Sequence, residues 1–249
     1  MKKIAIQLIP IWTALGILLL WWIASLAIRV DLILPSPSET FVSLASLLTE
    51  GEFWTALGHT LIRASLAFTV SFAVALLCAL GRANAVCRRV SDCFFAFLRS
   101  VPTMSVILLL LIFLKPSGAP QAVAAIVICP TLYSAFSAAA DLVEPQLMEV
   151  CRLYRVKKKD VFFRFWLPSV ASGLFEGAAS GFSLNLKLVI SAEAIAHTVK
   201  SFGNLMQNAQ IWLQTDRLIA LTLTAVLLGA LGEWCIRLIG RSVVRWKSR

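Results

Sequence analysis

Residues 57–80 read LGHTLIRASLAFTVSFAVALLCAL, and this segment decides the fold class. Among these residues only Arg63 is charged at neutral pH. An α-helix of this length spans about 36 Å, at 1.5 Å per residue, which exceeds the roughly 30 Å hydrocarbon core of a bilayer. We therefore predict a transmembrane helix over these residues.

The composition of the whole chain extends this interpretation. Of 249 residues, 59% are hydrophobic and only 14% are charged, whereas a soluble globular domain is about 45–50% apolar and about 25% charged. The strand-like alternation that a membrane β-barrel requires does not occur in the sequence. We predict an all-α, polytopic membrane protein with a single transmembrane domain over residues 1–249.

Six apolar segments account for most of that domain. We expect transmembrane spans at about 9–28, 57–80, 93–114, 119–143, 169–196 and 218–239. The first run is too long for the apolar core of a signal peptide and lacks a small-residue cleavage site, so we interpret it as an uncleaved span. The Pro- and Ser-rich segment 32–39 cannot continue that helix, and a short amphipathic stretch follows it to about Leu48.

The basic residues predict the orientation of the spans. With the amino terminus inside, the inner segments hold about 17 of the 23 lysines and arginines, which agrees with the basic bias of short cytoplasmic loops. Both termini are then cytoplasmic. The net charge of +10 follows from this topology, and because the basic residues form no stripe interleaved with aromatic side chains we predict no nucleic-acid partner.

No metal or cofactor site is predicted for this chain. The six cysteines contain no CxxC pair, and the two histidines, His59 and His197, lie far apart in the sequence. A zinc site would need clustered cysteine and histidine ligands. We interpret the cysteines as reduced, unpaired thiols that pack as small apolar side chains.

A polar segment, 144–168, separates the fourth and fifth spans. Its pattern predicts a short helix near Glu149, a basic turn that includes Lys157, and an amphipathic helix from Asp160 that ends at Pro168. The positive charge of this segment, taken by itself, is explained by a connector that binds anionic lipid headgroups. The spacing of the other residues favours a docking function instead.

This spacing resembles the EAA loop of ATP-binding-cassette (ABC) importer permeases. The family pattern is Glu-Ala-Ala, three residues, Gly, nine residues, an apolar residue, any residue, and then Leu-Pro. Glu149, Leu167 and Pro168 fall in register, Cys151 replaces the second alanine, and Arg155 replaces the glycine. Because glycine commonly supplies a turn with positive φ, the turn here is expected to differ in shape, or the loop to have diverged for its own partner.

Further stretches resemble permeases of the nitrate, sulfonate and taurine type. They are LPSPSE at 34–39, TLIRASLAF at 60–68, LRSVP at 98–102, SAE at 191–193 and the segment 212–216. Their shared order and spacing cover about residues 32–245, which is nearly the whole chain. The resemblance implies a type I ABC importer permease fold.

The resemblance also implies a multi-pass transport subunit of the bacterial inner membrane, and not an enzyme. ATP and Mg²⁺ would bind to separate ABC ATPase subunits, since this chain contains no GxxxxGK[ST] loop. The other implied partners are a second permease copy in a homodimer, an extracytoplasmic substrate-binding protein and membrane lipid. Family substrates include sulfonates, taurine, nitrate and thiamine-precursor pyrimidines. The residues implied to couple to the ATPase are Glu149, Cys151, Arg152, Arg155, Lys157, Leu167 and Pro168.

The fifth predicted span carries two patterns. Gly173, Gly177 and Gly181 recur every four residues, which lets another helix approach closely, either within the monomer or between two copies. Intramembrane charges usually face a protein interior or a water-filled cavity. We predict that polar side chains here line the transport pathway, with a buried structural network as the alternative. The candidate pathway residues are Arg63, Glu176, Ser180, Ser183, Lys187, Ser191 and Glu193.

Arg63, in the second span, has three interpretations. Its side chain could extend to the membrane surface, pair with a structural partner such as Glu193, or contact an anionic substrate.

Three other classes of membrane protein fit less well. A rhomboid-type protease needs a Gly-x-Ser-Gly nucleophile and a partnering histidine, and a secondary transporter is expected to show internal repeats. The membrane component of an energy-coupling-factor importer uses short Ala-Arg-containing motifs. None of these patterns is recognisable in the sequence.

Overall fold

A computed structural model of the chain describes residues 2–28, 30, 32–143 and 145–243. Within these ranges every regular element is a helix, as the sequence predicts. The long helices are α1 (Lys2–Ile28), α3 (Gly51–Gly81), α6 (Ala119–Asp141), α9 (Leu167–Ile195) and α11 (Thr215–Val243). The shorter elements are α2 (Pro37–Thr49), α4 (Ala85–Ser100), α5 (Thr103–Phe113), α7 (Pro145–Leu153), α8 (Lys158–Asp160), the π-helix η1 (Val161–Trp166) and α10 (Phe202–Ile211).

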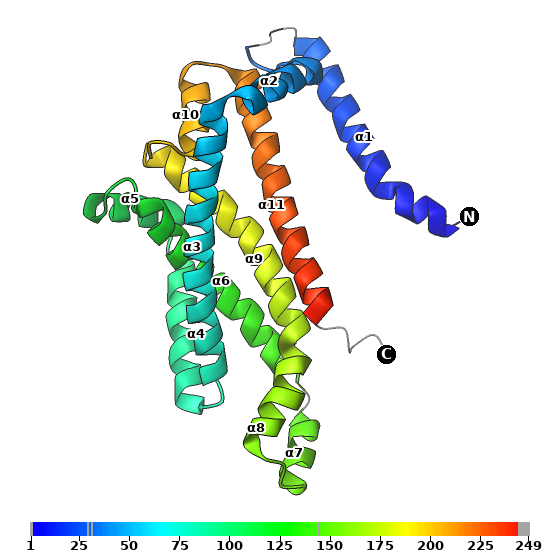
Figure 1. Cartoon of the computed structure of the whole chain (residues 1–249), viewed down its shortest axis with the longest axis vertical. Coiled ribbons are helices and arrows are strands. Elements are labelled where there is room, and N and C mark those ends of the chain that lie inside the picture. The colour runs from blue at the N-terminus through cyan, green and yellow to red at the C-terminus, as the bar shows by residue number, and fades with distance from the viewer. Residues whose placement is uncertain (1, 29, 31, 144, 244–249) are drawn as a thin grey trace.

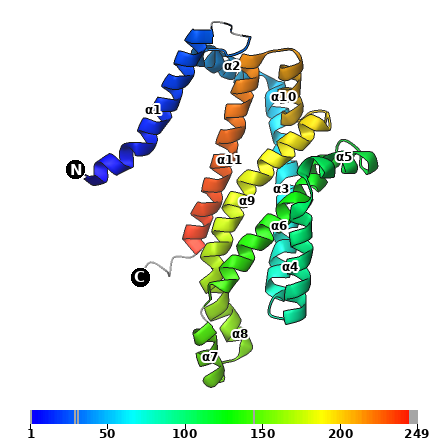
Figure 2. The same ribbon diagram turned by 180° about the vertical axis from the view of Figure 1, so that it is seen from behind.

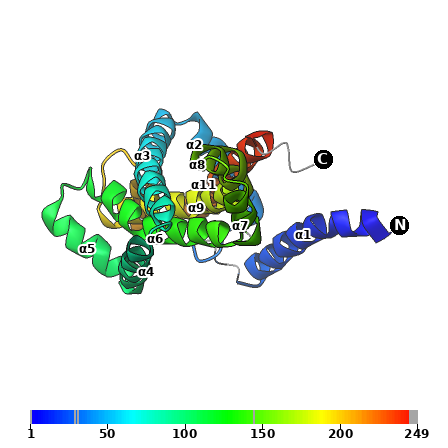
Figure 3. The same ribbon diagram turned by 90° about the horizontal axis from the view of Figure 1, so that it is seen from below.

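Four long helices form the centre of the molecule. α9 packs against both α6 and α11, and α6 packs in turn against α3 (Figure 1). α2 and α10 lie at one end of this bundle, whereas α7 and α8 project from the opposite end (Figures 1 and 2). α1 stands apart from the bundle (Figure 3).

The Pro- and Ser-rich segment after α1 begins the crosswise helix α2. The Ser36 hydroxyl accepts a hydrogen bond from the Glu39 backbone N–H, and the Glu39 carboxylate accepts one from the Ser36 N–H at 2.9 Å. This is a capping box, with Pro37 in the first helical turn. The predicted amphipathic stretch after residue 38 is therefore a helix.

The third predicted span is not one helix. The sequence predicts a continuous helix over 93–114, but α4 ends at Ser100 and α5 begins at Thr103, at 90° to it. Pro102 lacks a backbone N–H and disfavours helical backbone at the residue before it, and Val101 is extended with ψ of 126°. The 93–114 segment is therefore broken between α4 and α5, and its assignment as one span stays a prediction.

Three helices of the described chain, α3, α6 and α11, are long and apolar enough to cross a bilayer. The bent α4–α5 pair makes a fourth if it counts as one span. α9 has the length of the predicted fifth span, but its serines, glycines and charged residues dilute its apolar content. Within α1, Leu15–Ile28 is a shorter apolar helical segment among the described residues. The count of six spans stays a prediction.

The glycines of α9 bring it into close contact with α6. A β-carbon at Gly173 would lie 2.5 Å from the Ala139 β-carbon, and one at Gly177 would lie 2.7 Å from that of Ala135. At Gly181 it would meet the Leu132 side chain at 2.5 Å. All three contacts are made within one chain, so in this structure the glycine face serves helix packing inside the monomer.

We expect Gly177→Ala to destabilise the bundle by about 1–3 kcal/mol, because the added methyl group overpacks the α6–α9 contact. The matched control is Gly58→Ala in α3, where a β-carbon would meet nothing within 4 Å. That control should be neutral or stabilising by up to about 1 kcal/mol, since alanine is the better helix former. Thermal unfolding in detergent compares the two variants. Equal stability would contradict the close approach of α6 and α9.

Candidate functional site

The polar loop between the fourth and fifth predicted spans projects from the bundle as α7, α8 and η1 (Figure 2). Glu149 and Lys157 are exposed, Cys151 is half-buried, and Leu167 and Pro168 are half-buried where α9 begins. Glu144 and the Arg152 side chain lie outside the described residues. Loop residues therefore reach the surface at the end of the molecule opposite α2 and α10.

Arg155 adopts the backbone conformation that glycine would supply. Its φ is +50°, in the left-handed region that L-residues rarely occupy. The Val156 N–H donates to the Cys151 carbonyl oxygen at 3.1 Å, which is the outer hydrogen bond of a Schellman motif. Arg155 thus occupies the position after the helix end where this motif usually has glycine. The expectation of a differently shaped turn is wrong: Arg155 keeps a left-handed backbone there.

Pro168 does not end the amphipathic helix as predicted. η1 runs directly into α9, and Pro168 lies in the first turn of α9. Pro168 has no backbone N–H to donate, and the Leu167 N–H before it donates to the Phe162 carbonyl oxygen, so the π-helix continues into α9 at this proline. Phe162 and Trp166 stack within η1, with ring centroids 5.4 Å apart and an angle of 15° between the rings. The loop therefore joins α9 as one continuous helical segment.

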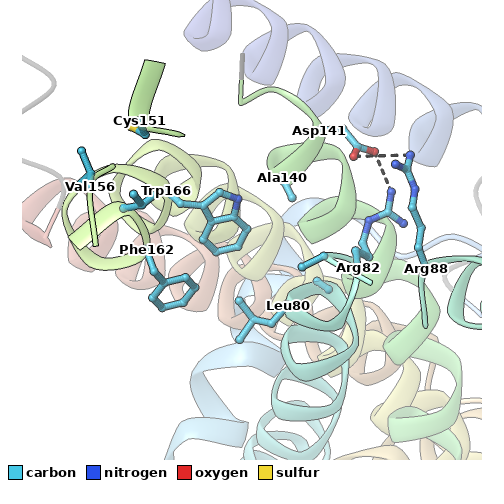
Figure 4. Close-up of a pocket in the computed structure, with 12 residues that line it drawn as sticks. Leu80, Arg82, Arg88, Ala140, Asp141, Cys151, Val156, Phe162 and Trp166 are labelled. Carbon is cyan, nitrogen blue, oxygen red and sulfur yellow. Dashed lines mark hydrogen bonds and ion pairs between the residues drawn. The ribbon is translucent and has the colours of Figure 1, made fainter. Parts of the chain in front are cut away.

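A cavity of about 590 Å³ lies at the base of the loop. Figure 4 shows Cys151, Phe162 and Trp166 on one side of this cavity, and Arg82 and Asp141 on the other. The cavity thus separates the apolar inner side of the loop from a charged cluster at the ends of α3 and α6. It leaves the loop in partial contact with the bundle.

Arg82 organises that charged cluster. Its guanidinium donates to Asp92 at 2.5 Å, to Asp141 at 2.9 Å and to the Tyr133 hydroxyl at 2.9 Å. Burial acts to lower the pKa of Arg82, but the Tyr133 hydrogen bond and the Asp141 charge raise the pKa above its ordinary value. Sequence reasoning missed this cluster, because its members come from three helices that only folding brings together.

The tip of the loop exposes apolar side chains. Leu153 is 79% exposed and Tyr154 is 76% exposed at the end of α7, and Phe163 in η1 is also exposed. Exposed apolar residues that gather on a projecting element, surrounded by polar residues, are typical of a protein interaction site. The motif spacing identifies Glu149, Leu167 and Pro168 but gives no sign of Leu153, Tyr154 or Phe163.

At the opposite end, Arg63 and Glu193 form an ion pair of 2.9 Å. The Glu193 side chain is fully buried and Arg63 is 12% exposed. Glu193 also accepts hydrogen bonds from the Thr60 hydroxyl at 2.8 Å and from the Gly203 N–H at 3.3 Å. Thr60 in turn accepts one from the Phe202 N–H at 2.9 Å. The network joins α3, α9 and α10, and the pairing of Arg63 with Glu193 is confirmed.

The remaining candidate pathway residues lie on α9. Glu176 pairs with Arg237 of α11 at 3.4 Å, and Arg237 also contacts Glu233. Ser180 donates to the Glu176 carbonyl oxygen, and Ser183 is half-buried beside Gly229. The exposed residues of α9 are Ser169, Glu176, Ser180, Leu184, Lys187 and Ser191. These six recur at spacings of three, four and seven, so they share one face of the helix.

Residues 71–245 match the family described as the binding-protein-dependent transport system inner membrane component. This chain belongs to that family. The putative aliphatic sulfonates transport permease protein SsuC of Escherichia coli (strain K12) is 27% identical to this chain. The alignment, with its gaps, is 255 residues long and covers 98% of this chain and 94% of that protein.

Two solved structures share the fold of this permease. One is a chain of an amino acid ABC transporter with histidines, with a TM-score of 0.61, 17% identity, and coverage of 78% of this chain and 93% of that chain. The other is a chain of the MetNI methionine ABC transporter in an inward-facing conformation, with a TM-score of 0.60, 18% identity, and coverage of 82% and 97%. The type I ABC importer permease fold is confirmed, and the permease is a multi-pass membrane transport subunit.

We expect Arg155→Gly to stabilise the loop by about 1 kcal/mol, because it removes the cost of a left-handed backbone in an L-residue. Hydrogen exchange at the Val156 N–H should slow by about fivefold. Arg155→Val should accelerate it, since a β-branched residue fits this conformation poorly. Lys157→Gly is the control, because the Lys157 backbone does not have positive φ and gains nothing from glycine. Slower exchange in the control alone would contradict this account of the turn.

We expect Arg63→Ala and Glu193→Ala each to cost about 3–5 kcal/mol of stability, because each leaves a buried charge without its partner. The double variant should cost clearly less than the sum of the two single costs. The same cycle on Arg217 and Glu50, which are 2.5 Å apart but partly exposed, should give at most about 1 kcal/mol per variant. Additive costs at Arg63 and Glu193 would show that the pair is not coupled.

Proposed function

We propose that this permease imports a small sulfonate across the bacterial inner membrane, driven by separate ABC ATPase subunits and supplied by an extracytoplasmic binding protein. The observation that carries the proposal is the projecting 144–168 loop, with its exposed apolar tip, in a chain of the binding-protein-dependent transport family. The similarity to the sulfonate permease SsuC supports the substrate class.

The loop is suited to receive force from an ATPase subunit. Leu153, Tyr154 and Phe163 offer exposed apolar contacts on this loop, while Glu149, Arg155 and Lys157 offer exposed charged ones. ATP and Mg²⁺ belong to the ATPase subunits. Because η1 continues into α9, displacement of the tip acts directly on a central helix of the bundle.

The charge distribution supports an orientation with this loop in the cytoplasm. The loop end carries Arg82, Arg88, Arg155, Lys157 and Lys159, and the α2 and α10 end carries several acidic residues. Basic residues favour the cytoplasmic side of a membrane. α1 runs from its amino-terminal end to the α2 end, and α11 runs back from the α2 end towards the loop end, so this orientation supports cytoplasmic termini.

The exposed face of α9 supports a transport pathway shared with a second copy of the chain. The exposed residues of α3 and α11 include large apolar side chains such as Ile62, Leu66, Leu227 and Leu231, as suits contact with lipid. On α9 five of the six exposed residues are polar. Polar side chains at membrane depth face water or protein, so a homodimer that encloses this face satisfies them.

We expect Leu153→Asp and Glu149→Lys to release the ATPase subunit from the purified transporter, because each alters the exposed tip without touching the bundle. Val199→Asp, at the opposite end and 73% exposed, is the matched control and should keep the subunit bound. Co-purification and ATP hydrolysis are measured for each variant. The chain alone should hydrolyse no ATP.

Retention of the ATPase by both tip variants, with unchanged transport, would overturn the coupling assignment. The loop would then serve as the lipid-binding connector. In that case Lys157→Gln together with Lys159→Gln should weaken binding to anionic vesicles without changing ATP hydrolysis.

A further inference from the structure

We infer that Lys187 gives the transport pathway its preference for anions. The inference rests on the proposed pathway along the exposed face of α9, and it names the residue that sets the charge of the transported solute. It follows from how the structure distributes the charges of the α9 pathway candidates and of Arg63.

Three of the four candidate charges are engaged in ion pairs. Arg63 pairs with the buried carboxylate of Glu193 at 2.9 Å, so it is committed to holding α3, α9 and α10 together. Glu176 pairs with Arg237 of α11 at 3.4 Å. Arg63 therefore leaves no net charge on the α9 face. Arg237 is shared between Glu176 and Glu233, so that group keeps one negative charge, about 16 Å along the helix from Lys187.

Lys187 differs from these three. It is exposed, and within the described part of the chain it makes no ion pair or hydrogen bond. It lies about 12 Å along the helix from the end of α9 at Ile195, so it is well inside the helix. A lysine ammonium at this depth is unfavourable in contact with lipid tails. Its stable surroundings are a water-filled passage.

The neighbours of Lys187 fit a passage for an oxyanion. Ser183 and Ser191 lie one helical turn to either side, with Ser191 on the exposed face and Ser183 half-buried beside Gly229. Hydroxyl groups donate hydrogen bonds to sulfonate-like oxygens without trapping them as a pair of cations would. One ammonium among hydroxyls therefore attracts an anion and still allows it to leave, and a second copy would double the charge.

The test uses two water-borne thiol reagents of equal reach and opposite charge. Sulfonatoethyl methanethiosulfonate is anionic and is itself a sulfonate, whereas trimethylammonioethyl methanethiosulfonate is cationic. Leu184→Cys places a thiol on the exposed face, one turn from Lys187. Leu231→Cys places one on the exposed apolar face of α11 as a control. Labelling of the assembled transporter in membranes is quantified at each peptide by mass spectrometry.

We expect the thiol of Leu184→Cys to react with both reagents and the thiol of Leu231→Cys to react with neither. Adding Lys187→Gln should lower the anionic-to-cationic rate ratio at 184 by about fivefold or more, because a unit charge at about 5–6 Å is removed. Lys187→Arg should preserve the ratio, and Lys187→Glu should invert it. Lys115→Gln, an exposed lysine outside α9, should leave the ratio unchanged. Co-purification of the ATPase with each variant confirms assembly.

The outcomes separate the inference from the proposed function. If the Leu184→Cys thiol is as unreactive as the Leu231→Cys thiol, the exposed face of α9 is not in contact with water and the proposed pathway fails. If Cys at 184 reacts but Lys187→Gln leaves the ratio unchanged, the pathway stands and the anion-selecting role of Lys187 is overturned.

Discussion

The close contact between α6 and α9 is the constraint on which the rest of the structure depends. Gly173, Gly177 and Gly181 allow α6 to lie where β-carbons on α9 would collide with it. α11 makes the reciprocal arrangement, since Gly232 and Gly240 lie against Phe182 and Phe175 of α9. α9 is thereby fixed between two apolar helices, and van der Waals packing offsets the cost of placing a polar helix in a membrane.

That packing leaves α9 with three different sides. Glycines face α6, phenylalanines face α11, and serines with Glu176 and Lys187 remain exposed. The ends differ as well. Glu193 ties the outer end to α3 and α10 through buried hydrogen bonds, whereas the other end continues through η1 into the projecting loop. A push on the loop therefore acts on a helix whose far end is held, so tilting is favoured over translation.

Much of this arrangement is readable from the sequence, because apolar content and glycine spacing are local properties. The all-α fold follows from residue types, whereas the glycine contact within the monomer and the pairing of Arg63 with Glu193 were each one of the alternatives that residue types and spacing left open. The 90° bend between α4 and α5 does not follow from apolar content, because apolar content measures affinity for lipid and says nothing of direction. Pro102 was the available signal for that bend.

Only part of the candidate site can likewise be predicted from the sequence. The motif positions Glu149, Leu167 and Pro168 are found by spacing, but the exposed Leu153 and Tyr154 are known only once the loop is seen to project. The left-handed backbone of Arg155 could not be predicted from an arginine, since the conformation is imposed by the helix end and the Cys151 hydrogen bond. The Arg82 cluster depends on tertiary contacts alone.

The fold gives the charged residues of the spans two different roles: some hold the helices together, and others face the proposed transport pathway. A buried ion pair contributes specificity of packing when both partners are satisfied, and Arg63 with Glu193 meets that condition through Thr60 and Gly203. Once these charges are assigned to the scaffold, the exposed face of α9 holds serine hydroxyl groups, Lys187 and Glu176, and Glu176 pairs with Arg237. A pathway that also exposed the Arg63 guanidinium would present a second cation to the anion and bind it more tightly. Neutralising Arg63 inside the protein therefore serves transport as much as stability.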